Sequence, residues 1–317
     1  MQQINIEKTK ISSKKSLFAT IKRDFNKNKL LYLLILPVIA YYIIFEYGPM
    51  YGVQIAFKDF SPGRGIWKSA WVGLKHFKNF FDSIYFFRLI RNTFLINLYS
   101  LIFGFPAPII LALLLNEIKN EKFKKTVQTI SYIPHFISTV IICGMIVGFS
   151  LSDGIFNDII NFFGGERTSL LQRASNFRTI YVASGIWQGV GWGSIIYFAA
   201  LTSIDPELYQ AAIIDGAGRL RQVIHISIPG ILPTIVILLI LNLGSMMSVG
   251  FQKIILLYNP SIYETADVIS TFVYRKGLLE LSYSFSAAVG LFNTVINFTL
   301  LIISNYVSRK VNETSLW

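Results

Sequence analysis

Cysteine and charge are scarce in this sequence of 317 residues, which has one Cys and 15% charged residues. Cys143 has no partner for a disulfide within the chain. Soluble domains average about 25% charged residues, whereas 53% of the residues here are hydrophobic. The composition therefore disfavours a soluble enzyme, a disordered chain and a secreted scaffold stabilised by disulfides.

Residue groups that bind metals or phosphates are also missing. His135 has no second His or Cys at the spacing of metal ligands, so no metal site is predicted. The sequence has neither a glycine-rich phosphate loop nor a paired-carboxylate motif, so we predict no catalytic residue and no cofactor in this chain. If the protein transports a solute actively, a partner must supply the energy.

Long apolar runs, by contrast, are abundant. A helix that crosses a bilayer needs roughly 20 mostly apolar residues. Six stretches have this character, at about 30–55, 92–116, 128–150, 178–203, 231–256 and 282–307. No small-residue cleavage site follows the first, so we expect it to be retained rather than removed as a signal peptide. Because charged residues lie mainly in the gaps, we predict an all-α, polytopic membrane protein with six transmembrane helices.

The distribution of basic residues predicts the orientation. The chain carries 29 Lys and Arg against 17 Asp and Glu, a net charge of +12. The basic excess is larger in the segments that are cytoplasmic in an N-in/C-in topology, which favours that topology. The predicted segments are a cytoplasmic basic arm 1–29, a first transmembrane helix 30–56, an extracellular loop 57–90, a five-helix core 91–307 with a cytoplasmic loop 203–230, and a cytoplasmic tail 308–317.

Two of these segments have a competing interpretation as nucleic-acid binders. We expect the arm 1–29 to lie along anionic lipid headgroups instead. The loop 57–90 mixes aromatic residues with Lys and Arg, but it lies outside in this topology. It is expected to lie on the membrane surface or to form part of a docking site for an external protein. We therefore predict no nucleic-acid partner.

The loop 203–230 begins with residues that start a helix. Asp205 suits an N-cap, Pro206 the first helical position, and Glu207 the positive end of the helix. A break near Gly216 then separates two short helices, the second of which is expected to be capped by Asp215.

The first short helix carries a small-residue surface at Ala211 and Ala212, to which a partner can approach closely. Pro229 and Pro233 are expected to end the amphipathic stretch and to start the next span. The loop is therefore predicted to form a docking surface beneath the membrane.

This pattern resembles the EAA loop of ABC-importer permeases, the family of binding-protein-dependent inner-membrane components. In that family the loop sits in a groove of the cytosolic ATPase subunit. The resemblance therefore implies an ATPase-coupling role for Glu207, Gln210, Ala211, Ala212, Asp215, Gly216, Ala217 and Arg219. Gln210 stands where the family usually has Glu, so the contact of that one side chain is left open.

Shorter motifs are similar to the branch of the family that imports complex carbohydrates. They are Tyr47-Gly48-Pro49-Met50-Tyr51-Gly52, Phe103-Gly104-Phe105-Pro106-Ala107-Pro108, Tyr132-Ile133-Pro134-His135-Phe136, Tyr258-Asn259-Pro260, Tyr263-Glu264-Thr265-Ala266-Asp267 and Ser315-Leu316-Trp317. The resemblance implies the MetI-like fold of type I importers, a bacterial plasma-membrane location and an oligosaccharide substrate. It also implies a second homologous permease, two cytosolic ATPase subunits that bind ATP and Mg, and an extracellular substrate-binding lipoprotein.

A pathway for sugar needs aromatic faces and hydrogen-bonding groups around a cavity, because an unpaired polar group in lipid is costly. The candidates are Trp187, Gln188 and Trp192 in the fourth predicted span, Asn242, Gln252 and Tyr258 in or after the fifth, and Asn293 in the sixth. Hydrogen bonds between helices and interfacial aromatic belts are the competing interpretation of each.

Two further patterns concern helix shape. Gly185, Gly189 and Gly193 form a strip that favours close contact with another helix. The prolines expected to break their helices are Pro106, Pro108 and Pro134.

Two other functions compete with transport driven by a partner ATPase. A membrane enzyme acting on lipid-linked sugars needs acidic residues at the membrane edge. The candidates are Asp153, Asp158, Asp205 and Glu207, which form no paired signature. An ion-driven carrier needs ionisable groups inside the membrane, where the predicted spans have almost none.

Overall fold

The computed structural model describes residues 24–312, which fall into two compact units with a boundary after Gln54. Most of these residues are helical, which confirms the predicted all-α class. Most of the predicted arm 1–29, the end of the predicted tail 308–317 and the Ser315-Leu316-Trp317 motif lie outside the described residues.

The first unit contains one helical run. It comprises α2 (Lys29–Tyr41), a π-helical turn (Tyr42–Tyr47), α3 (Gly48–Met50) and the beginning of a 3₁₀ turn (Tyr51–Phe57). No side chain of α2 is buried within this chain. A helix with apolar side chains on all sides is typical of one that contacts lipid or other helices.

The second unit begins with short elements that precede its long helices. They are β1 (Lys58–Asp59), α4 (Gly65–Lys68), β2 (Ala70–Trp71) and α5 (Lys75–Phe81). The two strands pair antiparallel, with Lys58 opposite Trp71 and Asp59 opposite Ala70. Phe80 of α5 is fully buried in a cluster with Phe272 and Val289, so this segment packs onto the helices that follow.

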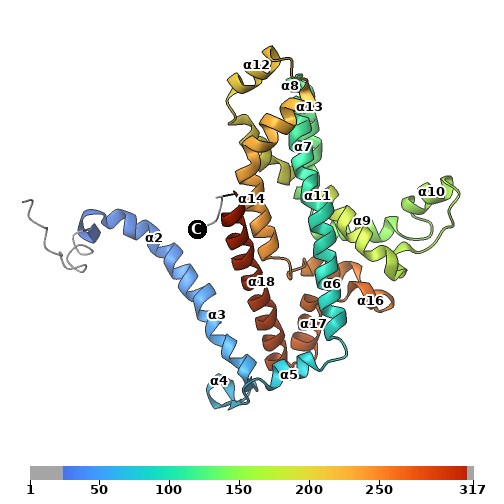
Figure 1. The fold of residues 1–317 in the computed structure, drawn as a ribbon. Coiled ribbons are helices and arrows are strands. Elements are labelled where there is room, and N and C mark those ends of the chain that lie inside the picture. Colours follow the sequence, from blue (N-terminus) through green and yellow to red (C-terminus); the bar gives the residue numbers. More distant parts are fainter. Residues whose placement is uncertain (1–23, 313–317) are drawn as a thin grey trace, which may run out of the picture. The chain divides into compact units, whose positions relative to one another are not determined.

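The next part of the chain contains three long helical runs. They comprise α6 (Phe86–Tyr99), a π-helical turn (Ser100–Gly104) and α7 (Pro106–Glu117); α8 (Glu121–Tyr132), a 3₁₀ turn (Ile133–Phe136) and α9 (Thr139–Phe149); and, after α10 (Ile155–Phe162), α11 (Ala174–Thr202). Within the second unit (Figure 1), α11 contacts α7, α8, α14 and α16.

The C-terminal part contains two further long runs separated by short helices. The elements are α12 (Pro206–Ile214), α13 (Arg219–Gln222), a π-helical turn (Val223–Ser227), α14 (Ile228–Gly244), α15 (Phe251–Leu257), α16 (Tyr263–Ala266), α17 (Ile269–Tyr274), a π-helical turn (Arg275–Leu279) and α18 (Tyr283–Asn312). Because α18 continues to Asn312, the predicted tail begins as helix.

Four helices of the described chain are long and apolar enough to cross a membrane: Lys29–Phe57, Phe86–Glu117, Arg219–Gly244 and Tyr283–Lys310. The bent pair Glu121–Phe136 and Thr139–Phe149 makes a fifth if it counts as one span. The 29-residue helix α11 has sufficient length, but Gln188 and several Gly, Ser and Trp residues make its middle less apolar. The membrane-spanning architecture is thus present with four or five apolar spans.

The third predicted span is not one straight helix. Its two halves meet at an angle of 95°. Pro134 lacks a backbone N–H, and the Ser138 side chain accepts a hydrogen bond from Val140 N at 3.3 Å, which starts a new helix. The predicted break at Pro134 is therefore confirmed, and its consequence is a sharp bend.

The breaks predicted at Pro106 and Pro108 are wrong, since the helix runs from Phe86 to Glu117. A π-helical turn directly precedes Pro106 and accommodates the missing N–H. Pro229 follows a similar turn, and Pro233 lies inside α14, so neither ends a helix.

The fifth predicted span is displaced along the chain. The helix begins at Arg219 and ends at Gly244, rather than covering 231–256. Residues 245–250 include Ser and Gly, which are poor helix formers, and α15 is a separate element. As a result, the side chains of α15 point in other directions than they would if α14 continued as one helix through residue 257.

Candidate functional site

The helix α12 lies near the end of the second unit where α11 terminates (Figure 1). As predicted, the Asp205 side chain accepts a hydrogen bond from Glu207 N at 2.9 Å, and Pro206 occupies the first turn. No residue of α12 is buried, and Ile214 is 87% exposed. The helix thus begins at its own cap, is joined to the following turn by a hydrogen bond between Tyr209 Oη and Ser227 Oγ at 3.0 Å, and presents apolar side chains outward.

The second short helix predicted for this loop is not separate from the next span; it forms the beginning of that span. Gly216 adopts a φ of +75°, which ends α12 with a turn that favours glycine. Asp215 is the C-cap residue of α12 instead of a cap for the next helix, and Gly218 precedes α13. Because α13 runs through the π-helical turn into α14, only residues 215–218 separate α12 from the start of an apolar span.

A cavity of about 360 Å³ lies halfway along α11. Its lining includes Gln188 at the midpoint of that helix, Ser100 of the π-helical turn between α6 and α7, and Lys253 of α15. We call it the mid-helix cavity; the remaining lining residues are Gly104, Pro108, Tyr181, Val182, Gly185, Ile186, Gly189 and Val190. Its volume lies within the ~300–1,000 Å³ typical of ligand sites.

The glycine strip of α11 lines this cavity more than it packs against a helix. No other atom lies within 4 Å of a Cβ at Gly189, and a Cβ at Gly185 would meet Lys253 Nζ at 3.5 Å. Gly193 of the strip lies against α7, where a Cβ would meet Pro108 at 3.2 Å. Gly191 of α11, outside the strip, makes a closer approach, since a Cβ there would collide with the backbone at Ser131.

The other predicted pathway residues lie at separate places. Trp187 lines a second, apolar cavity of about 480 Å³ beside α9. Trp192 stacks on His135, with ring centroids 4.5 Å apart and parallel planes. Asn293 lines a groove next to α17, where its Oδ1 is buried and has no hydrogen-bond partner among the described residues.

Three further predicted pathway residues line neither of the two cavities nor the groove. Asn242 is exposed and donates to Leu238 O of its own helix at 2.8 Å. Gln252 is exposed on α15, and Tyr258 packs against Tyr263 with ring centroids 5.0 Å apart. Of the predicted pathway residues, only Gln188 lines the mid-helix cavity, where Lys253 accompanies it.

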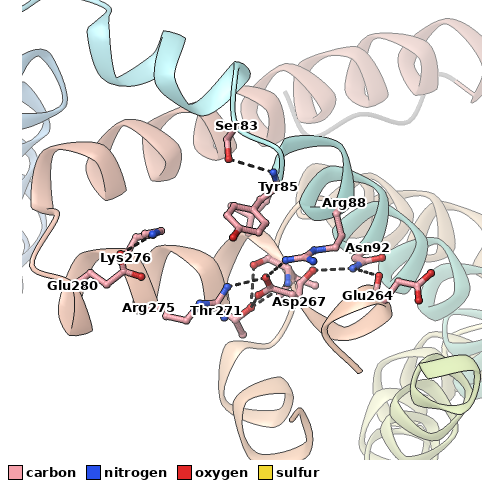
Figure 2. A network of polar contacts seen from close by, with 12 residues as sticks. Ser83, Tyr85, Arg88, Asn92, Glu264, Asp267, Thr271, Arg275, Lys276 and Glu280 are labelled. Carbon is pink, nitrogen blue, oxygen red and sulfur yellow. Dashed lines mark hydrogen bonds and ion pairs between the residues drawn. The ribbon is translucent and has the colours of Figure 1, made fainter. Parts of the chain in front are cut away.

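A buried polar network, which the sequence analysis missed, joins α6 to the α16–α17 segment (Figure 2). The Asp267 side chain is fully buried and receives hydrogen bonds from Arg88 Nη2 at 3.3 Å and Arg275 Nη2 at 2.8 Å. Thr271 Oγ1 donates to the other carboxylate oxygen at 2.9 Å. We call Arg88, Asn92, Asp267, Thr271 and Arg275 the polar clamp.

Asn92 extends the clamp to the backbone. Its Nδ2 donates to the carbonyl oxygens of Glu264 and Asp267 at 2.9 and 3.0 Å, and its Oδ1 accepts from Arg178 Nη2 at 2.9 Å. Burial alone lowers the pKa of Arg275, but its hydrogen bond to Asp267 and the charge of that carboxylate outweigh burial and raise it. The clamp thus joins three helical segments through hydrogen bonds between charged and polar side chains.

Comparison with known proteins gives one family match. A family model described as "Binding-protein-dependent transport system inner membrane component" matches residues 104–313. That range contains α12, the mid-helix cavity except its Ser100 edge, and the C-terminal part of the polar clamp.

Two relatives are similar over nearly their whole length. Protein LplB of Bacillus subtilis (strain 168) is 45% identical over 303 residues, which cover 95% of this chain and 94% of LplB. The polygalacturonan/rhamnogalacturonan transport system permease protein YteP of the same organism is 44% identical over 292 residues, covering 92% and 91%.

One solved structure is similarly close. A chain in the crystal structure of a bacterial ABC transporter, described as involved in the import of the acidic polysaccharide alginate, is 44% identical with a TM-score of 0.86. The match covers 92% of this chain and 99% of that chain. A second structure of an alginate ABC transporter, in complex with an alginate pentasaccharide-bound periplasmic protein, matches with the same TM-score.

Proposed function

This chain belongs to the family of binding-protein-dependent transport system inner membrane components, and from this premise we propose that it forms one half of a pathway for an oligosaccharide. It is a permease subunit of the ABC-importer type and a multi-pass protein of the bacterial plasma membrane. The matched family consists of transport components, and YteP and the alginate importer chain are named as such, so the family does not favour a lipid-linked sugar enzyme or an ion-driven carrier. ATP hydrolysis belongs to other chains.

The proposed topology has six spans with both termini inside. It counts the bent pair α8–α9 as the third span and the less apolar α11 as the fourth. The loop with α12 is then cytoplasmic, and the segment 57–90 lies outside. The proposed core remains 91–307, and the arm 1–29 and the tail 308–317 are assigned to the cytoplasm.

The observation that carries the mechanism is the exposed, self-capped helix α12 joined through one turn to the long helix Arg219–Gly244. We assign ATPase contact to the coupling residues 207–219 named above. ATP and Mg bind to two partner ATPases, whose closure moves α12 and, through it, the start of the fifth span. A second permease completes the pathway, and an external binding lipoprotein delivers the sugar.

The experiment that tests this assignment is co-purification of the cytosolic ATPase with variants of the loop. We expect Gly216→Trp, or deletion of residues 209–218, to abolish co-purification. Gly164→Trp is the matched control, because Gly164 also has a positive φ, +85°, with open space around it. Equal ATPase recovery with Gly216→Trp and Gly164→Trp would contradict the proposed docking role.

The pathway assignment has its own test. Gln188→Ala together with Gln252→Ala should lower oligosaccharide uptake roughly tenfold, since each lost neutral hydrogen bond costs about 0.5–1.5 kcal/mol. The complex should still assemble, because neither side chain forms a hydrogen bond or ion pair within residues 24–312. Gln172→Ala, an exposed glutamine outside α11, serves as control; uptake at the control's level would exclude these two residues from the pathway.

A further inference from the structure

The mid-helix cavity contains one charged side chain among its described lining residues, that of Lys253. Lys253 is 9% exposed, and its ammonium group points to the glycine face of α11. The absence of a side chain at Gly185 leaves room for this group, and Gly189 leaves open space one turn further on. A buried cation therefore borders an open volume.

Contacts within the chain hold this lysine in place but do not neutralise it. Lys253 Nζ donates to Tyr181 O at 3.1 Å and lies 5.0 Å from the centre of the Tyr181 ring. Cys143 Sγ lies 3.9 Å from Lys253 O, which fixes the backbone of α15. Among residues 24–312, no Asp or Glu lies within ion-pair distance of Nζ, so two of its three donors remain for another group.

A buried ammonium without an anion is costly, and a carboxylate is the group that offsets this cost most effectively. Ionisable side chains at membrane depth generally mark the path of a substrate or ion. Gln188 and Ser100 line the same cavity and can bind hydroxyl groups. One cation beside neutral hydrogen-bonding groups fits a sugar ring that carries a carboxylate better than it fits a neutral sugar.

We propose that Lys253 binds a carboxylate of the transported chain, so that the substrate is an acidic, uronate-containing oligosaccharide. This inference rests on the proposed function, because it names the substrate class of the same pathway. The cation selects the sugar by its charge, while Gln188 and Ser100 contact its hydroxyl groups. A purely structural Lys253, which only joins α15 to α11, would affect all substrates equally.

The experiment uses the complete transporter in proteoliposomes, with its second permease, ATPases and binding protein. The acidic probes are tetragalacturonate and an alginate tetrasaccharide, and the neutral probes are the carboxyl-reduced form of tetragalacturonate and arabinotetraose. We expect the wild type to import an acidic probe and Lys253→Met to reduce that import about tenfold to a hundredfold, the range for a lost charged hydrogen bond. Lys253→Arg should keep import within about threefold.

The control for loss of one positive charge is Lys78→Met, at an exposed lysine far in sequence from the cavity. Two results would overturn the assignment of Lys253 but leave the permease function intact. In the first, the transporter imports only the neutral probes; in the second, the complex retains its ATPases but imports no acidic probe. Failure of the chain to associate with any ATPase overturns the proposed function itself.

A second pair of variants keeps the test decisive if Lys253→Met does not fold. Gly185→Asp places an internal carboxylate beside Lys253 Nζ and should reduce import of the acidic probe at least tenfold. Gly185→Asn has nearly the same size without the charge and should reduce import less than about threefold. Equal loss with the two Gly185 variants shows that only space matters and overturns the proposal.

Discussion

The polar clamp and the docking helix α12 use polar residues in opposite ways. In the clamp, Asp267 is fully buried and its oxygens are occupied by groups of the same chain. In α12 no residue is buried, and among the described residues its side chains are held by the Asp205 cap and by one hydrogen bond between Tyr209 Oη and Ser227 Oγ at 3.0 Å. The clamp therefore fixes the chain internally, whereas α12 leaves its surface for another protein.

This contrast predicts that clamp variants lower the stability of the chain, whereas α12 variants change only local order and partner binding. The largest effect is expected for Asp267→Ala, which leaves Arg88 and Arg275 facing each other without an anion. Loss of one partner from a buried ion pair costs about 3–5 kcal/mol, so the thermal unfolding midpoint of the purified chain in detergent should fall strongly.

The neighbouring Lys276–Glu280 pair provides the control for this variant (Figure 2). It joins Lys276 Nζ to Glu280 Oε2 at 2.6 Å, but both side chains are partly exposed. Glu280→Ala should cost about 1 kcal/mol or less, as surface pairs do. Equal shifts of the midpoint for Asp267→Ala and Glu280→Ala would show that the clamp does not stabilise the chain.

An intermediate effect is expected for Asn92→Ala. This change leaves the carbonyl oxygens of Glu264 and Asp267 and the Arg178 guanidinium without their partner. A buried group left unsatisfied costs about 1–3 kcal/mol, and the same unfolding measurement should detect it. Asn97→Ala, which removes a bond only to Thr93 O of its own helix, should shift the midpoint less; the reverse order would refute the importance of the bridge.

The smallest effect on the chain is expected at α12. Asp205→Ala removes the N-cap, which is worth about 1 kcal/mol, and hydrogen exchange of the amides of α12 should accelerate. The unfolding midpoint of the whole chain should stay unchanged, because α12 buries nothing. Asp205→Asn retains a capping oxygen and should restore protection; exchange as fast as in Asp205→Ala would argue against the capping role.

Local chemistry made the start of α12 predictable from the sequence. Asp205, Pro206 and Glu207 are consecutive, and each has a strong preference for its position at a helix N-terminus. The apolar runs likewise identified the long helices, because hydrophobicity over some twenty residues does not depend on distant partners.

The clamp and the mid-helix cavity were not predictable in this way. Arg88 and Asp267 are 179 positions apart, and nothing in the residues around either indicates the other. Lys253 falls within the apolar stretch 231–256 that predicted the fifth span, because the apolar pattern continues through residues 245–250 although the helix does not. Only the break after Gly244 turns α15 back to α11 and brings Lys253 to Gly185.

The π-helical turns before Pro49, Pro106 and Pro229 share one arrangement. Such a turn contains one residue more than an α-helical turn, and one residue corresponds to a rotation of about 100° around the helix axis. Removing a single residue from any of these turns would rotate the remaining helix relative to the first half. The face that each half of the helix presents can thus change without a change in the other half. Insertion or deletion of one residue at these sites would therefore let a different face of a span turn toward the pathway during evolution.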